Sequence, residues 1–220
     1  MTFIEETIQK SWDIWSQYVD HPFLKDIRNH TMKQDMFIQY LIEDTKYLKE
    51  YARCFGMGIF KSETMDEICL FYEMLKFVES NESAARIRML KALGYDVKQL
   101  EVEPKQETCR NYTNFLHEVA KNEGNIEILY ATLPCMLSYA YIGKCLLEEN
   151  ADLIQESVYG DWIQEYCCTE YLEKCKTWMN FANEASQYLK ENEKEHLQEL
   201  FREASIHELK FWNMSYQTKG

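Results

Sequence analysis

A cysteine, Cys135, stands in the middle of a stretch without charges (residues 128–143), directly after Pro134. A proline inside a helix leaves the carbonyl group four positions earlier, on Tyr130, without its usual donor and bends the helix axis. Tyr139 follows one turn later on the same face. A thiol beside a kink, with a phenol one turn away, can line a pocket in the core. The alternative is that Cys135 is a small buried packing residue.

Two acidic residues occupy positions where apolar ones are expected. Asp44 lies on the inner stripe of a predicted long helix, and Glu208 lies between Ala204 and Phe211 on the inner face of the last predicted helix. A buried carboxylate must be paired or hydrogen-bonded, because the loss of its water is costly. Each acid therefore either bonds a buried tyrosine or backbone group, or takes part in chemistry. Tyr47 shares the face of Asp44.

Metal chemistry finds little support in the sequence. The eight cysteines form no C-x-x-C pair, and no group of residues has the spacing of zinc ligands. Glu193 and His196 match the Glu-x-x-His spacing of di-iron bundles, but such a site needs two of these pairs and two more glutamates. This pair lies in a highly charged stretch, which favours a solvated helix face. We interpret His21, before Pro22, as a capping or packing residue.

Apolar residues recur every three or four positions along most of the chain, which predicts amphipathic helices that would carry these side chains. The expected helices cover residues 3–19, a short segment from 22, 33–61, one or two helices between 64 and 94, 106–121, the central segment 128–143, helices from about 154 to about 190, and a last helix that includes 197–215. The first has the apolar stripe Ile4, Ile8, Trp12, Trp15 and Tyr18. A break is expected at Asn81 and Ser83, and a connection at 96–105.

Composition predicts an all-α protein. Glycine (7) and proline (3) are scarce among the 220 residues, so hairpin turns lack their usual residues, and the length suits one domain over residues 1–220. The central segment is apolar all round, so it belongs at the centre of the bundle, covered by other helices. At sixteen residues it is shorter than the roughly 20 that cross a bilayer, and we expect no membrane span.

The net charge of −13, from 37 acidic and 24 basic residues, argues against nucleic acid and anionic lipid as partners. The N-terminal residues MTFIEETIQK lack the pattern of a signal peptide. Together with the unpaired cysteine spacing, this favours free thiols in a reducing cytoplasm. Neither a glycine-rich phosphate loop nor a G-x-S-x-G elbow is present, which argues against nucleotide and α/β-hydrolase chemistry.

A set of motifs along nearly the whole chain resembles the TenA family, the thiaminase II enzymes, whose fold is the haem-oxygenase-like helical bundle. The matching residues are His21-Pro22-Phe23, Asp44 with Tyr47, Tyr112, Leu133-Pro134-Cys135 with Tyr139, Trp162-Ile163 with Tyr166, and Glu208 with Phe211-Trp212. The cysteine places the chain with the cysteine-bearing branch of that family. Met136-Leu137 and Cys167-Cys168 depart from the residues expected there, and they concern the pocket walls more than the chemistry.

The resemblance implies hydrolysis of aminopyrimidines in thiamin salvage. The substrate class is 4-amino-5-aminomethyl-2-methylpyrimidine, which gives the 5-hydroxymethyl compound, with thiamin cleavage as a related activity. It further implies a homotetramer that needs no metal or cofactor. Two alternatives are kept: a non-catalytic helical regulator or scaffold, and a metal- or haem-dependent oxidase on the same fold, which the missing second Glu-x-x-His disfavours.

The resemblance also implies a role for each candidate residue. Cys135 is the nucleophile that adds to C6 of the pyrimidine, since even a small thiolate fraction is strongly nucleophilic. Glu208, with a pKa raised by burial, is the acid that protonates ring nitrogen N1. Asp44 accepts hydrogen bonds from the exocyclic amine. The expected substrate-binding tyrosines are Tyr47, which stacks on the ring, and Tyr112, Tyr139 and Tyr166, whose hydroxyls orient it.

Overall fold

A computed structural model describes residues 1–80 and 84–216, and within these ranges the regular structure is helical, as predicted. The helices are α1 (Phe3–Lys10), α2 (Trp12–Val19), α3 (Pro22–Arg28), α4 (Gln34–Lys61), α5 (Met65–Ser80), α6 (Ala84–Ala92), α7 (Val97–Leu100), α8 (Glu107–Asn122), α9 (Asn125–Glu149), α10 (Leu153–Glu156), α11 (Gly160–Cys167), α12 (Thr169–Ser186) and α13 (Glu191–Ser215). The break expected at Asn81 and Ser83 lies outside the described residues.

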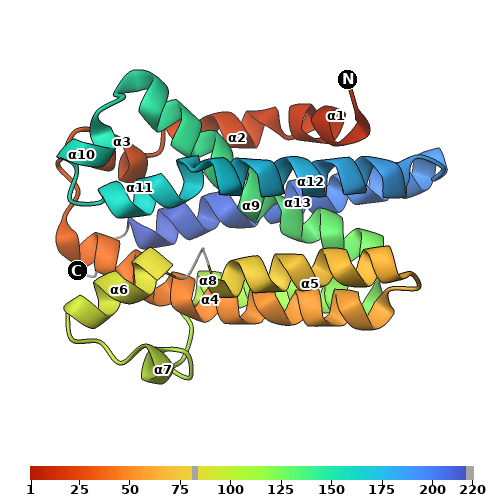
Figure 1. Ribbon diagram of the computed structural model, residues 1–220, viewed down its shortest axis with the longest axis horizontal. Coiled ribbons are helices and arrows are strands. Elements are labelled where there is room, and N and C mark those ends of the chain that lie inside the picture. The colour runs from red at the N-terminus through yellow and green to blue at the C-terminus, as the bar shows by residue number, and fades with distance from the viewer. Residues whose placement is uncertain (81–83, 217–220) are drawn as a thin grey trace.

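The central helix α9 extends the predicted segment 128–143 at both ends and continues through Pro134. It packs against α2, α4, α8, α11, α12 and α13. Figure 1 shows α1–α3 along one side of the molecule and α4 with α5 along the other, with α9 and α13 between them. By length and hydropathy α9 is the one described helix that could cross a membrane, but 78% of its most apolar window is buried in the protein. It is a core helix.

The structure corrects three details of the predicted helices. The segment 3–19 is two helices, because Ser11 leaves the helical conformation (φ −101°, ψ 8°), as a residue whose hydroxyl competes for backbone groups often does. Trp12 then lies outside the buried stripe and is 46% exposed. The connection at 96–105 contains the short helix α7, capped by the Asp96 carboxylate. The segment from 154 to 190 forms α11 and α12, preceded by the short α10.

The long helix α4 is tied to the connection that follows α7 by a buried ion pair. Lys46 donates to Glu43 at 2.8 Å and to the carbonyl oxygen of Pro104 at 3.0 Å. The second oxygen of Glu43 accepts from the backbone N–H of Gln106 at 2.9 Å. Since both charges are buried but paired and hydrogen-bonded, the arrangement fixes the start of α8 against α4. This positions Tyr112, which α8 carries.

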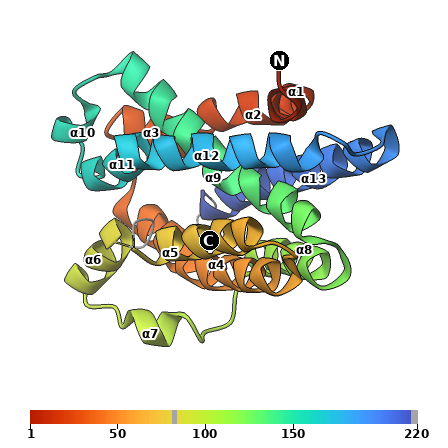
Figure 2. The ribbon, with the colours of Figure 1, turned by 45° about the vertical axis from the view of Figure 1, so that its right-hand side comes forward.

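A glycine lets α11 approach the central helix closely. A Cβ atom at Gly143 would lie 2.7 Å from Sγ of Cys167 and 3.4 Å from Cβ of Tyr166, so a larger residue would force the Cys167 side chain to move. In Figure 2, α11 lies at the same end of the molecule as α6, and the two helices are in contact. The close approach of α11 to α9 brings Tyr166 beside Tyr139.

Candidate functional site

Glu208, on α13, lies inside the core beside the thiol of the central helix. Its carboxylate accepts a hydrogen bond from the Tyr112 hydroxyl at 2.8 Å. Burial raises the pKa of Glu208 to about 7, while hydrogen bonds from Tyr112 and from the Cys135 thiol oppose the rise. A carboxyl group with this pKa holds and releases a proton near neutral pH, which suits a general acid. The prediction that burial raises the pKa of Glu208 is thus supported.

Tyr112 is held in a stack of rings that runs from α4 to α13. On one side its ring stacks on Tyr47, with centroids 4.8 Å apart, and on the other on His207, at 5.1 Å with planes 3° apart. Phe115 closes the stack on the far side of His207 at 5.2 Å. Burial lowers the pKa of His207 to about 4, so this imidazole stays neutral near pH 7. The stack fixes the direction of the hydroxyl that reaches Glu208.

A second group of aromatic rings lies around Tyr139 on α9. The hydroxyl of Tyr139 on α9 lies 3.0 Å from that of Tyr40 on α4, in hydrogen-bond contact. The ring of Tyr166 on α11 packs against Tyr139 with centroids 4.6 Å apart. Trp212, one turn after Glu208, stacks on Tyr40 at 5.4 Å with planes 10° apart. Three helices besides α9 thus contribute rings to one cluster.

Asp44 is also buried, but its partner was not foreseen. Its Oδ2 atom accepts a hydrogen bond from Nη1 of Arg86, on α6, at 3.1 Å. The tyrosine or backbone partner considered for Asp44 from the sequence is therefore wrong among the described residues. Burial raises the pKa of Asp44, and the guanidinium opposes the rise. The charge of Asp44 also raises the pKa of Glu208, although its effect is smaller than those of burial and of the two hydrogen bonds. The two acids therefore influence each other's charge.

All seven side chains predicted for the site lie in this cluster. The contacts join Cys135, Glu208, Tyr112 and Tyr47 on one side, and Tyr139 with Tyr166 on the other. The charge of Asp44 raises the pKa of Glu208 on one side and that of Tyr139 on the other, so Asp44 acts on both sides. The structure thus places the seven together; their roles remain proposals.

Sequence reasoning missed three residues that support the cluster, Tyr40, Arg86 and His207. Tyr40 precedes Asp44 by one helical turn on the inner stripe of α4, where packing is the default for a tyrosine. An arginine on a short amphipathic helix usually faces water, and nothing in the local sequence links Arg86 to Asp44. His207 precedes Glu208 and so points to a different face, where only the fold brings it against Tyr112.

Two polar atoms of the cluster have no good partner. The hydroxyl of Tyr47 and Nε1 of Trp212 are buried and make no hydrogen bond of ordinary geometry within the described residues. Buried polar groups are nearly always hydrogen-bonded in native proteins. Groups of this kind beside a thiol and two acids are suited to a polar, flat ligand.

The other predicted polar residues have structural tasks. His21 accepts a hydrogen bond from the backbone N–H of Phe23 at 3.1 Å through Nδ1, and its Nε2 faces Asn213 at 3.2 Å, which confirms the capping assignment. Glu193 accepts from the backbone N–H of Lys190 and so caps α13. His196 is partly exposed and pairs with Glu123. In the described chain no three His, Cys, Asp or Glu side chains gather as a metal would require.

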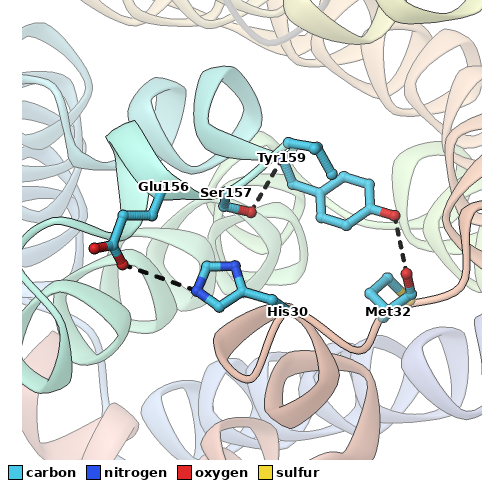
Figure 3. A pocket seen from close by; sticks show the side chains of 6 residues that line it. His30, Met32, Glu156, Ser157 and Tyr159 are labelled. Atoms are coloured by element: carbon cyan, nitrogen blue, oxygen red, sulfur yellow. Dashed lines mark hydrogen bonds and ion pairs between the residues drawn. The ribbon is translucent and has the colours of Figure 1, made fainter.

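A surface cavity of about 380 Å³ lies apart from the cluster, between the loop after α3 and the loop after α10. Figure 3 shows the Tyr159 hydroxyl donating to the carbonyl oxygen of Met32 at 3.2 Å, and His30 facing Glu156 at 3.9 Å. None of the seven predicted site residues lines it. An adjoining groove includes Leu41 and Met89. Leu41 lies about one helical turn before Asp44, and Met89 lies about one turn after Arg86.

The arrangement of a cysteine, two acids and stacked tyrosines on separate helices agrees with a sequence model that matches residues 8–218, that of the TENA/THI-4/PQQC family. The chain belongs to this family. Its fold is that of the TenA proteins, which confirms the all-α, haem-oxygenase-like bundle predicted from the sequence. A TenA family transcription regulator from a Silicibacter species has a TM-score of 0.87 at 24% identity, covering 98% of this chain and 97% of that one.

A more distant structure supports the same fold. A protein with a haem-oxygenase-like fold from Shewanella denitrificans has a TM-score of 0.76 at 10% identity and covers 97% of this chain and 91% of its own. Several relatives by sequence are named aminopyrimidine aminohydrolase, among them the following two. The protein from Halalkalibacterium halodurans is 27% identical and covers 100% of this chain and 97% of its own length. The one from Helicobacter pylori is 28% identical and covers 96% of both.

Proposed function

We propose that this chain is an aminopyrimidine aminohydrolase, a thiaminase II, which acts in thiamin salvage. One observation carries the proposal. The buried Glu208, with a pKa raised to about 7 by desolvation, is in hydrogen-bond contact with the Cys135 thiol of the central helix. An acid that gives up its proton near neutral pH, beside a nucleophile, is what the displacement reaction requires. The names of the full-length relatives point to the same reaction.

The preferred substrate class is 4-amino-5-aminomethyl-2-methylpyrimidine. The sulfur of Cys135, as the thiolate, forms a bond to C6 of the ring while Glu208 gives its proton to N1. The enamine so formed expels the nitrogen of the aminomethyl group, which is protonated as an ammonium group in the substrate, from the methylene on C5 as ammonia. Water then adds to the methylene, and the proton that it loses converts ammonia to ammonium. The bond between C6 and sulfur breaks as Glu208 takes back the proton of N1, which leaves the 5-hydroxymethyl product and the thiolate.

The remaining residues hold the ring. Asp44 accepts from the exocyclic amine through Oδ1, the oxygen that Arg86 does not hold. Tyr47 presents a buried face and a hydroxyl without a good partner, so it stacks on the pyrimidine and bonds it. Tyr139 and Tyr166, on α9 and α11, pack with their rings tilted by 51° and supply orienting hydroxyls, and Tyr112 directs the Glu208 carboxyl. No step calls on a metal or cofactor.

A direct assay tests the proposal. The purified protein is incubated with the aminomethylpyrimidine, ammonia is measured by a coupled assay, and the pyrimidine product is identified by mass spectrometry. We expect ammonia and the 5-hydroxymethyl compound in equal amounts. Thiamin, whose leaving group is a thiazolium, is assayed in parallel to rank the leaving groups. A protein that binds neither compound and releases no ammonia from either would contradict the proposal.

The second candidate is a regulator without catalytic activity, favoured by the name of the Silicibacter protein. The net charge of −13 weighs against direct contact with DNA, since phosphates repel such a surface. A regulator would be expected to bind the pyrimidine without turnover. The ammonia assay therefore separates the two functions.

We further propose that the protein works as a homotetramer in the cytoplasm. Exposed apolar side chains of Met57, Phe60 and Met65 surround the turn between α4 and α5, with Phe60 83% exposed. Apolar surface of this kind is commonly buried between subunits. Light scattering of the protein as it leaves a sizing column measures the mass and checks the number of subunits.

A further inference from the structure

Arg86 forms an ion pair with Asp44 inside the protein. Both side chains are nearly buried, with 6% of Arg86 and 11% of Asp44 exposed, and Nη1 lies 3.1 Å from Oδ2. The two residues belong to α6 and α4, which pack together. The guanidinium keeps its charge at any physiological pH. An unpaired carboxylate at this depth would take up a proton, because burial disfavours the charged form.

The ion pair involves only one of the two carboxylate oxygens of Asp44. Oδ2 accepts from Arg86, whereas Oδ1 accepts no hydrogen bond from any described residue. A guanidinium can bind both oxygens of a carboxylate side by side, and a pair built only to join two helices would gain from doing so. Here one oxygen is held and the other is left for a donor that comes from elsewhere.

We propose that Arg86 is a positioning residue of the site, which keeps Asp44 ionised and turned so that Oδ1 accepts the exocyclic amine of the pyrimidine. The inference rests on the proposed function, because it takes an aminopyrimidine as the ligand. Arg86 itself does not touch the substrate. It determines which form of Asp44 the substrate meets.

The surroundings of Asp44 leave Arg86 as the group that can do this. The titratable or charged groups that act on Asp44, or on which it acts, are Tyr40 on α4, Arg86 on α6, Cys109 on α8, Tyr139 on α9 and Glu208 on α13. Of these only Arg86 is a cation. The tyrosines and Cys109 have pKa values that burial raises further, so they are neutral at pH 7. Glu208 can only add negative charge.

The charge of Asp44 reaches the acid of the reaction. An ionised Asp44 raises the pKa of Glu208, so it favours the protonated form that gives its proton to N1. By keeping Asp44 ionised, Arg86 thus helps to set both the amine acceptor and the acid. A guanidinium that served only to join α4 to α6 would influence stability, but not the pH dependence of binding.

The experiment measures binding of the 5-hydroxymethyl product by calorimetry between pH 5 and pH 9. All variants carry Glu208→Gln, so that neither turnover nor the titration of Glu208 enters. In this background Arg86→Gln removes the charge but can still donate a hydrogen bond, and Arg86→Lys restores the charge. Arg88→Gln is the matched control, because Arg88 is on the same helix, is 62% exposed and pairs with Asp161 at 3.7 Å.

We expect Arg86→Gln to weaken binding at pH 7 by roughly 10- to 100-fold, the factor lost when a hydrogen bond to a charged group becomes one to a neutral group. The affinity should recover as the pH rises, since Asp44 then ionises without help. The acid-side midpoint should therefore move to higher pH, and Arg86→Lys should bring it back. Adding Arg86→Gln to Asp44→Asn should change little, because the residue on which it acts is gone.

An unchanged midpoint in Arg86→Gln, or an equal loss of affinity with and without Asp44→Asn, overturns the proposal. If Arg86→Gln does not fold by circular dichroism, Arg86→Lys decides, since a shifted midpoint despite the retained charge also overturns it. The wild-type chain is measured alongside for turnover. Failure of the wild type to bind or cleave any aminopyrimidine counts against the proposed function, whereas an active wild type with an unaffected Arg86→Gln counts against Arg86 alone.

Discussion

Glu50 on α4 and Glu208 on α13 are both buried glutamates, yet their surroundings shift their pKa values in opposite directions. Glu50 is 4% exposed, but three cationic side chains and one histidine reach its two oxygens. These are Arg53 at 3.0 Å, Lys105 at 3.1 Å, His117 at 3.2 Å and Lys49 at 3.5 Å. Burial alone would raise its pKa, but hydrogen bonds from Arg53 and Lys105 prevail and lower it to about 2.

Glu208 is buried among aromatic rings, the hydrogen bonds that it receives from described residues come from a phenol and a thiol, and its pKa rises to about 7. Burial alone therefore does not decide whether an acidic residue takes part in a reaction or stabilises the fold. The charge of its hydrogen-bond partners decides this. Cations fix Glu50 as an anion that ties α4 to α8 and to the connection before it, whereas neutral donors leave Glu208 able to exchange its proton.

The largest expected effect tests whether the surroundings of Glu208 serve a nucleophile. We predict that Cys135→Ser lowers turnover by at least roughly 10³-fold, because a serine hydroxyl is a much weaker nucleophile without an adjacent base. The change is nearly isosteric, so thermal stability should stay close to that of the wild type. Cys145→Ser, further along α9, is the control and should keep full turnover. Near-normal ammonia release by Cys135→Ser would remove the thiol from the mechanism.

The next effect concerns the proton of Glu208. Glu208→Gln keeps the shape but cannot transfer a proton, and it should lower turnover roughly 10²- to 10⁴-fold. In the wild type, turnover should fall on the alkaline side as Glu208 loses its proton, and on the acid side as the thiolate is lost, so a bell-shaped profile of the coupled pair is expected. The alkaline limb should flatten in the variant. A full rate with an unchanged profile would make Glu208 only a partner of Tyr112.

Tyr112→Phe gives a smaller effect, on the position of the alkaline limb. The Tyr112 hydroxyl lowers the pKa of Glu208, so its removal should raise that pKa and move the limb to higher pH. Turnover at pH 7 should fall about tenfold, because one hydrogen bond to the carboxyl is lost. Tyr130→Phe is the control, since that hydroxyl bonds Ala182 and Ser186. A limb that moves to lower pH would contradict the contact.

Glu50→Gln should leave turnover unchanged and reduce stability. The free energy of unfolding at pH 7, from urea titrations, should fall by about 1–2 kcal/mol, a modest figure because the cations around Glu50 are partly exposed. The folded-state pKa of about 2 lies below the ordinary value of 4.5. The stabilisation is therefore complete above about pH 4.5 and is lost as the pH falls toward 2. Equal stability of variant and wild type at pH 7 would disprove the structural role.

Much of the fold was predictable because one core imposes one pattern. The apolar period of α4, α8 and α13, and the uncharged run in α9, predicted these helices, and most of their ends lie within a few residues of the predicted ones. The all-α haem-oxygenase-like class is confirmed. The pattern failed at Ser11, where a hydroxyl residue ends α1 and shifts the stripe away from Trp12. The single domain over residues 1–220 and the homotetramer both remain predictions.

The site was predictable where an acid broke an apolar stripe, as at Asp44 and Glu208. The supporting contacts were not, because they join residues distant in sequence. Arg86 lies 42 positions from Asp44, and an arginine on an amphipathic helix normally snorkels to water. In the same way, Glu50 has cationic neighbours on its own helix, but nothing local shows that Lys105 and His117 complete the group. Such pairs follow from the fold and not from the spacing of residues.

The helix α4 carries Asp44 and Tyr47 on one face, and Glu43 and Glu50 on the neighbouring one. The first face meets the candidate site. The second is joined to α8 and to the connection before it, through the backbone N–H of Gln106 on Glu43 and through Lys105 and His117 on Glu50. A substitution that reshapes the site therefore leaves intact the contacts that keep the helix in place. This division of labour gives the protein room to evolve, since its substrate range can drift while its stability is secured by residues that take no part in the reaction.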